Sequence, residues 1–97
     1  MRTRLDDMLD LIRKEMTDYE RKNNGFFVVG VEIVLELSHA HVKVFYQGNE
    51  LGRTTLVGFY EMSESDFDWL KEKLMDAGMY FRKNKGSGYT FVKICNH

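Results

Sequence analysis

The chain has 97 residues, of which 43% are hydrophobic and 30% charged, and its formal net charge is −1. This length accommodates one domain, residues 1–97, and the composition is that of a globular protein rather than a disordered or membrane-embedded one. A net charge so close to zero excludes binding to nucleic acid or membranes by overall electrostatic attraction. Because no apolar run approaches about 20 residues and no secretory signal is visible, we expect a cytoplasmic protein with no membrane partner.

Residues 3–22 are predicted to form an amphipathic helix that ends at the Asn-Asn-Gly run 23–25. Residues 26–37 are predicted to form a long strand, because apolar and other residues alternate along it. One face of this strand is expected to be core, and it carries Phe27, Val29, Val31, Ile33, Leu35 and Leu37. The helices are therefore expected to cover that face, and Glu32 and Glu36 to lie on the opposite one.

The remaining elements follow from composition and spacing. A turn is expected at 38–40, strands at 41–47 and 53–61, and a hairpin loop between these strands; the pattern leaves the facing of 53–61 open. A second helix is predicted over 63–77, with Ser63 as its N-cap and Asp66 at its third position. Two strands, 79–83 and 89–95, follow with a turn between them. The sequence thus predicts an α+β domain of order α-β-β-β-α-β-β, an antiparallel meander with two helices packed on one face.

Catalytic motifs with recognisable spacing are absent from the sequence, so a small enzyme ranks last among the function classes, and no cofactor is expected. A zinc-binding domain is ranked with it as the third hypothesis. His39 and His41, like Cys95 and His97, have the i, i+2 spacing that points two side chains the same way from a strand. Cys95 is the only cysteine, so no internal disulfide forms, and we expect it to be structural.

The C-terminal segment suggests a second function class. Residues 79–97 contain Arg82, Lys83, Lys85 and Lys93 but no acidic residue. The run 85–92, Lys-Gly-Ser-Gly-Tyr-Thr-Phe-Val, resembles an RNA-recognition strand, in which aromatic side chains stack on bases. That family has an aromatic residue in place of Ser87. As a basic hairpin, residues 82–89 are nevertheless a candidate for binding phosphates, with Tyr89 stacking on a base.

A non-catalytic protein-binding module is the function that the sequence favours. The chain has more aromatic residues than a sheet covered on one face can bury, and Trp69 lies off the apolar stripe of its helix. We expect a homodimer or a stoichiometric regulator or inhibitor of a protein partner. The candidate binding residues, for protein or nucleic acid, are Trp69, Arg82, Lys83, Lys85, Tyr89 and Phe91. Two arrangements of 89–93 remain open: Tyr89, Phe91 and Lys93 either face outward beside Glu32, or the hairpin projects from the sheet.

Overall fold

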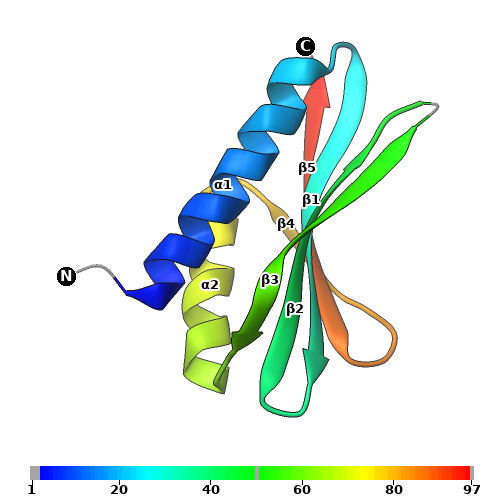
Figure 1. Ribbon diagram of the computed structural model, residues 1–97. Helices are drawn as coiled ribbons and strands as arrows, with labels where there is room; N and C mark the ends of the chain where they lie inside the picture. The colour runs from blue at the N-terminus through cyan, green and yellow to red at the C-terminus, as the bar shows by residue number, and fades with distance from the viewer. Residues whose placement is uncertain (1–2, 50, 97) are drawn as a thin grey trace.

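The computed structural model describes residues 3–49 and 51–96 and contains two helices and one five-stranded sheet (Figure 1). The elements, in chain order, are α1 (Arg4–Lys22), β1 (Phe26–Glu36), β2 (His39–Gln47), β3 (Gly52–Glu61), α2 (Glu64–Asp76), β4 (Tyr80–Lys83) and β5 (Gly88–Asn96). The predicted order of elements is confirmed, as is the single α+β fold. Both helices lie on the same side of the sheet.

The sheet has the strand order β3-β2-β1-β5-β4, and each neighbouring pair is antiparallel. A simple meander would have placed β4 beside β3, so that part of the prediction is wrong. Instead α2 carries the chain from one edge of the sheet to the other, and β5 pairs with β1. The strongly apolar β1 thereby becomes the central strand, with hydrogen-bonding partners on both of its edges.

The core lies between the helices and the β1 face that the alternation predicts. Phe27, Val29, Val31 and Ile33 are each at most 1% exposed, and Leu35 is half-buried. Burying each such side chain stabilises the fold by about 1.5–3 kcal/mol. From the helices, Met8, Leu9, Ile12, Leu70 and Leu74 complete this core.

Leu37 does not belong to the core, and its predicted placement is wrong. β1 ends at Glu36 and pairs there with His39, which leaves only Leu37 and Ser38 to turn the chain. Leu37 is fully exposed and has a φ of 52°, in the left-handed region. Ala40, expected in the turn, is instead buried in β2. The alternation of apolar residues in the sequence continues past the end of β1 to Leu37, so it does not show where the strand ends.

The facing of β3 was ambiguous because the strand contains a bulge. Val42 pairs with Gly58 whereas the next residue, Lys43, pairs with Leu56. Val57 is therefore an extra residue, and the alternation of faces is interrupted at this point. A single period-two pattern cannot fit such a strand.

Each helix begins with a capping box. The Ser63 hydroxyl accepts a hydrogen bond from the Asp66 backbone N–H at 3.1 Å, and the Asp66 carboxylate accepts one from the Ser63 backbone N–H. The predicted N-cap is confirmed, and Thr3 plays the same part with Asp6 in α1. Neither helix is long and apolar enough to cross a membrane, within the residues described.

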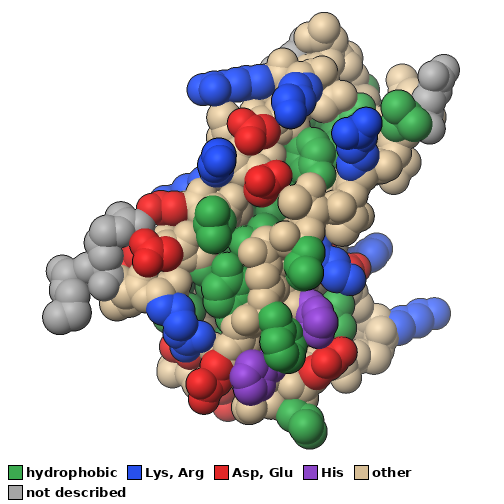
Figure 2. Space-filling model, viewed as in Figure 1, with side chains coloured by type: hydrophobic (Ala, Val, Ile, Leu, Met, Phe, Trp, Pro, Cys, Tyr) green, Lys and Arg blue, Asp and Glu red, His purple; other side chains and the backbone are tan. Residues whose placement is uncertain are grey.

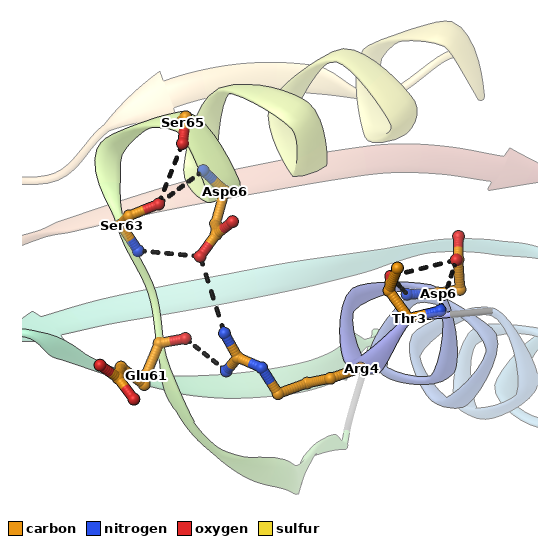
Figure 3. A network of polar contacts seen from close by, with 7 residues as sticks. All are labelled: Thr3, Arg4, Asp6, Glu61, Ser63, Ser65 and Asp66. Carbon is orange, nitrogen blue, oxygen red and sulfur yellow. Dashed lines mark hydrogen bonds and ion pairs between the residues drawn. The ribbon is translucent and has the colours of Figure 1, made fainter. Parts of the chain in front are cut away.

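The Arg4 side chain joins the two helix starts across the end of β3 (Figure 3). It donates from Nη1 to the carbonyl oxygen of Glu61 at 2.5 Å, and its Nη2 lies 3.7 Å from the Asp66 carboxylate. Half of the Arg4 side chain is exposed, so the ion pair itself contributes little. Its effect is to fix the first turn of α1 against the β3–α2 junction.

Candidate functional site

The sheet face opposite the helices is uncovered, and we call it the open face (Figure 1). It is formed by the even-numbered residues of β1, β4 and β5, the odd-numbered residues of β2, and, on β3, by Gly52, Thr54, Leu56, Phe59 and Glu61. Because the strands are antiparallel and in register, these side chains form rows that cross the strands. The rows differ in chemistry, and two neighbouring rows make up the candidate site.

The first row is apolar. It runs from Phe45 on β2 through Gly30 and Val92 to Tyr80 on the β4 edge. A Cβ atom at Gly30 would overlap the Phe45 ring, so the ring lies across the bare backbone of β1. Tyr80 is 68% exposed. With Val28, these side chains line a hollow of about 440 Å³.

The second row is charged. Lys43, Glu32, Thr90 and Arg82 follow one another across β2, β1, β5 and β4. A hollow of about 470 Å³ opens here, and Lys83 and Lys85 line it together with Glu32 and Arg82. Arg82 reaches it from the open face, whereas Lys83 pairs with Tyr89, on the helix side of β5, and borders it at the end of β4. The local charge of the hollow is positive although the chain as a whole is slightly acidic.

The turn beside this second hollow is firmly held. The buried Thr90 donates its hydroxyl hydrogen to Asn84 Oδ1 at 2.6 Å, and the Asn84 backbone N–H donates to the Gly88 carbonyl. Leu35 donates its backbone N–H to the Ser87 carbonyl at 2.9 Å, which ties the turn to the end of β1. The hairpin is thus part of the sheet. The arrangement in which it projects from the sheet is therefore wrong.

The arrangement in which Tyr89, Phe91 and Lys93 face outward beside Glu32 is wrong as well. Val31 pairs with Phe91 and Ile33 with Tyr89, so both aromatic residues lie on the helix side of the sheet. Phe91 is fully buried, and the Tyr89 ring centroid lies 4.3 Å from that of Phe67 on α2. As core residues beneath α2, neither is placed to contact a partner on the open face.

The other predicted binding residues are divided between two sides of the molecule. Arg82, Lys83 and Lys85 gather at the charged hollow. Trp69 lies on α2, where it is half-buried against the core and Lys73 Nζ is 5.7 Å from its ring. The basic residues therefore share a site from which Trp69 is separated by the thickness of the sheet.

The three predicted metal ligands within the described residues, His39, His41 and Cys95, are not brought together. His39 and His41 both point to the open face, as their spacing predicts. The His39 ring stacks on Phe59 at a centroid distance of 4.9 Å, and the His41 ring contacts Phe59 in a tilted arrangement at 4.5 Å. Cys95 faces the helices at the opposite end of β1, where it pairs with Phe27. His97 lies outside the described residues. Within those residues, no group of three or more His, Cys, Asp or Glu side chains is arranged to hold a metal.

The histidine end of the open face also carries carboxylates. Figure 2 shows two histidine side chains next to hydrophobic and acidic ones. His41 Nε2 lies 3.4 Å from the Glu36 carboxylate, and Glu61 pairs with His39. The β2–β3 side of the open face is therefore acidic and aromatic here, whereas its β4–β5 edge is cationic and apolar.

Cys95 is held as a thiol. Burial raises the pKa of Cys95. The negative charge of Glu20 and the hydrogen bond that Glu20 accepts from the thiol raise this pKa further, while the positive charge of Lys93 lowers it. Its Sγ donates to Glu20 Oε1 at 3.5 Å, and Lys93 Nζ lies 3.2 Å from the same oxygen. A buried thiol in this setting is a poor nucleophile.

Several open-face residues were not singled out from the sequence as binding candidates. The large hydrophobic side chains of this face that are more than half exposed are Phe26, Leu56, Phe59, Tyr80 and Ile94. Ile94 was identifiable in principle, because it alternates with the buried Cys95. Tyr80 and Phe59 were not, since their facing depends on the order of the strands and on the β3 bulge.

Comparisons of the chain with protein-family models, with curated proteins and with solved structures give no significant match.

Proposed function

We propose that this chain is a protein-binding module that contacts another protein through its open face. The observation that carries the proposal is the concentration of large hydrophobic side chains on a sheet face that no helix covers. Monomeric proteins rarely leave an extended apolar surface to water, and such surfaces mark interaction sites. The apolar row from Phe45 to Tyr80 is the centre of this surface, and the charged row forms its polar border.

The size of the open face suits a specific interface. Five strands about 4.8 Å apart, rising about 3.3 Å per residue, give a face of roughly 600–700 Å². An interface of ordinary size buries about 800 Å² on each partner. The face and its rim are therefore large enough for stable association without any contribution from the helices.

The test compares two pairs of substitutions in the tagged chain, expressed in cells of its own organism. Tyr80→Ser with Ile94→Ser alters the open face, and Leu11→Ser with Met75→Ser removes hydrophobic side chains of similar exposure from the two helices. We expect a partner protein to be recovered at least tenfold less with the first pair and equally well with the second. Equal recovery with both pairs would contradict the proposal. Circular dichroism confirms that both variants are folded.

Self-association is a separate outcome of the same comparison. If the purified chain sediments as a dimer that only the Tyr80/Ile94 pair dissociates, the partner is a second copy of the chain. Binding of nucleic acid is the second candidate function, and the cationic hollow around Arg82 and Lys85 favours it. Loss of the bound molecule on treatment with nuclease would select this alternative.

A further inference from the structure

We infer that the β4–β5 edge of the open face binds an extended acidic segment of the partner. A hydrophobic side chain of that segment occupies the apolar hollow over Val92 and Tyr80, and its carboxylates meet Arg82 and Lys85. This inference rests on the proposed function and specifies the chemistry of the partner.

The two hollows adjoin and form one groove. Arg82 and Thr90 line both of them, so the apolar hollow leads directly into the cationic one. A ligand that fills the groove must be apolar at one end and anionic at the other. The guanidinium of Arg82 lies at the boundary, where its planar fork is suited to a carboxylate.

Charge complementarity selects an acidic ligand. Arg82, Lys83 and Lys85 are exposed, and Glu32 is the one carboxylate among the lining residues. Asn84 adds amide N–H donors, because its hydrogen bond with Thr90 uses the amide oxygen. Like charges gathered around a hollow repel one another, and an incoming carboxylate relieves that repulsion.

The register of the sheet sets the spacing within the ligand. Val92 and Thr90 are two residues apart on β5, which places the two rows about 6.6–6.8 Å apart. An extended peptide that runs along β5 presents residues i and i+2 to the same side at the same spacing. The preferred segment therefore has a hydrophobic residue and, two positions away in either direction along the peptide, an acidic residue that meets Arg82. A second acidic residue, two positions beyond the first, reaches Lys85.

Single-stranded nucleic acid fits this groove less well. Tyr89 and Phe91, the aromatic side chains that would stack on bases, lie beneath α2. The apolar hollow beside the cations also has no counterpart in a sugar–phosphate chain.

A random nonapeptide library displayed on phage, selected on the immobilised full chain, tests the inference. We expect enrichment of peptides in which a hydrophobic residue and an Asp or Glu are two positions apart. The enriched peptide should bind at least tenfold more weakly to the Arg82→Glu, Lys85→Glu variant. The control, Lys14→Glu with Arg21→Glu, makes the same change in net charge on exposed positions of α1 and should alter binding less than twofold.

The inference is overturned if no peptide is enriched, if enriched peptides lack acidic residues, or if both charge-reversal variants weaken binding equally. Tighter binding of a single-stranded RNA 20-mer, lost on reversal of Arg82 and Lys85, would assign the groove to nucleic acid instead. The two proposals fail separately. A partner that is lost with Tyr80→Ser and Ile94→Ser but retained with Arg82→Glu and Lys85→Glu supports the proposed function and rejects the acidic ligand.

Discussion

The ring of Phe45 lies across Gly30 at the centre of the open face, where a Cβ atom at residue 30 would overlap it. The same Cβ would lie 2.5 Å from the carbonyl oxygen of Phe91 on the neighbouring strand. Gly30 is buried, so the ring shields backbone that a glycine in a strand leaves bare. This contact continues the apolar surface of the open face across β1 at a position where that strand has no side chain.

Gly30→Ala is expected to destabilise the fold although alanine suits a strand no worse than glycine. The added methyl group must displace both the Phe45 ring and a backbone carbonyl group, and overpacking of this kind costs about 1–3 kcal/mol. Urea denaturation measures the free energy of unfolding. Adding Phe45→Ala should recover part of the loss, because the ring overlap is then removed. A Gly30→Ala variant as stable as the unmodified chain would show that the ring is not held in this position.

Leu37→Gly is expected to stabilise the protein by about 1 kcal/mol. Leu37 has a φ of 52°, where a side chain is strained and glycine is not. Its side chain is fully exposed, so no burial is lost. Leu37→Val should have the opposite effect, because β-branched residues tolerate positive φ least. The two midpoints of urea denaturation should therefore lie on either side of that of the unmodified chain, and the reverse order would contradict the turn geometry.

Ser63→Ala is expected to lower the free energy of unfolding by about 1 kcal/mol, because it removes the hydroxyl that caps α2. Ser65→Ala is the matched control. Its exposed hydroxyl lies 3.1 Å from that of Ser63 and is not a member of the capping box. Thermal or urea unfolding should separate the two variants, and equal destabilisation would show that the cap is unimportant.

The Cys95 thiol is expected to react slowly with iodoacetamide in the folded protein. Burial and then Glu20 raise the pKa of Cys95, so the reactive thiolate is scarce at neutral pH. Glu20→Gln removes the charge that contributes to this shift, and it should lower the pKa and accelerate the reaction. Mass spectrometry of the alkylated protein measures the rate.

The same pKa shift predicts how stability depends on pH. The folded protein keeps the Cys95 proton to a higher pH than the unfolded chain does, so this contribution to stability is complete below the ordinary thiol pKa of about 8.5 and falls as pH rises above it. Cys95→Ala should weaken this alkaline loss of stability. If the free energy of unfolding of the variant falls equally steeply at alkaline pH, other groups cause the decrease.

The sequence predicted the fold where one physical signal dominated. The alternation along β1 identified the buried face of that strand correctly from Phe27 as far as Ile33. Ser63 followed by Asp66 identified the start of α2. Leu37 was misplaced because alternation carries no information on where a strand ends. The facing of β3 stayed open because the extra residue of a bulge interrupts the alternation.

The candidate site was predictable only in part. Arg82, Lys83 and Lys85 lie close together in the chain, and their clustering was visible as charge. The apolar hollow combines Val28 and Phe45 with Tyr80, residues brought together only because β5 inserts between β1 and β4. Local patterns do not determine that strand order. For the same reason the sequence placed Tyr89 and Phe91 among the binding residues, whereas the pairing of β5 with β1 turns them toward α2.

Photo-crosslinking in cells tests the central claim, that the open face contacts a protein partner, most directly. A photoreactive amino acid in place of Ile94 should give a discrete crosslinked product, because that side chain is 56% exposed on the open face. The same amino acid in place of Met75, which is 47% exposed on α2, should give none. Products of equal yield from both positions, or from Met75 alone, would contradict the account.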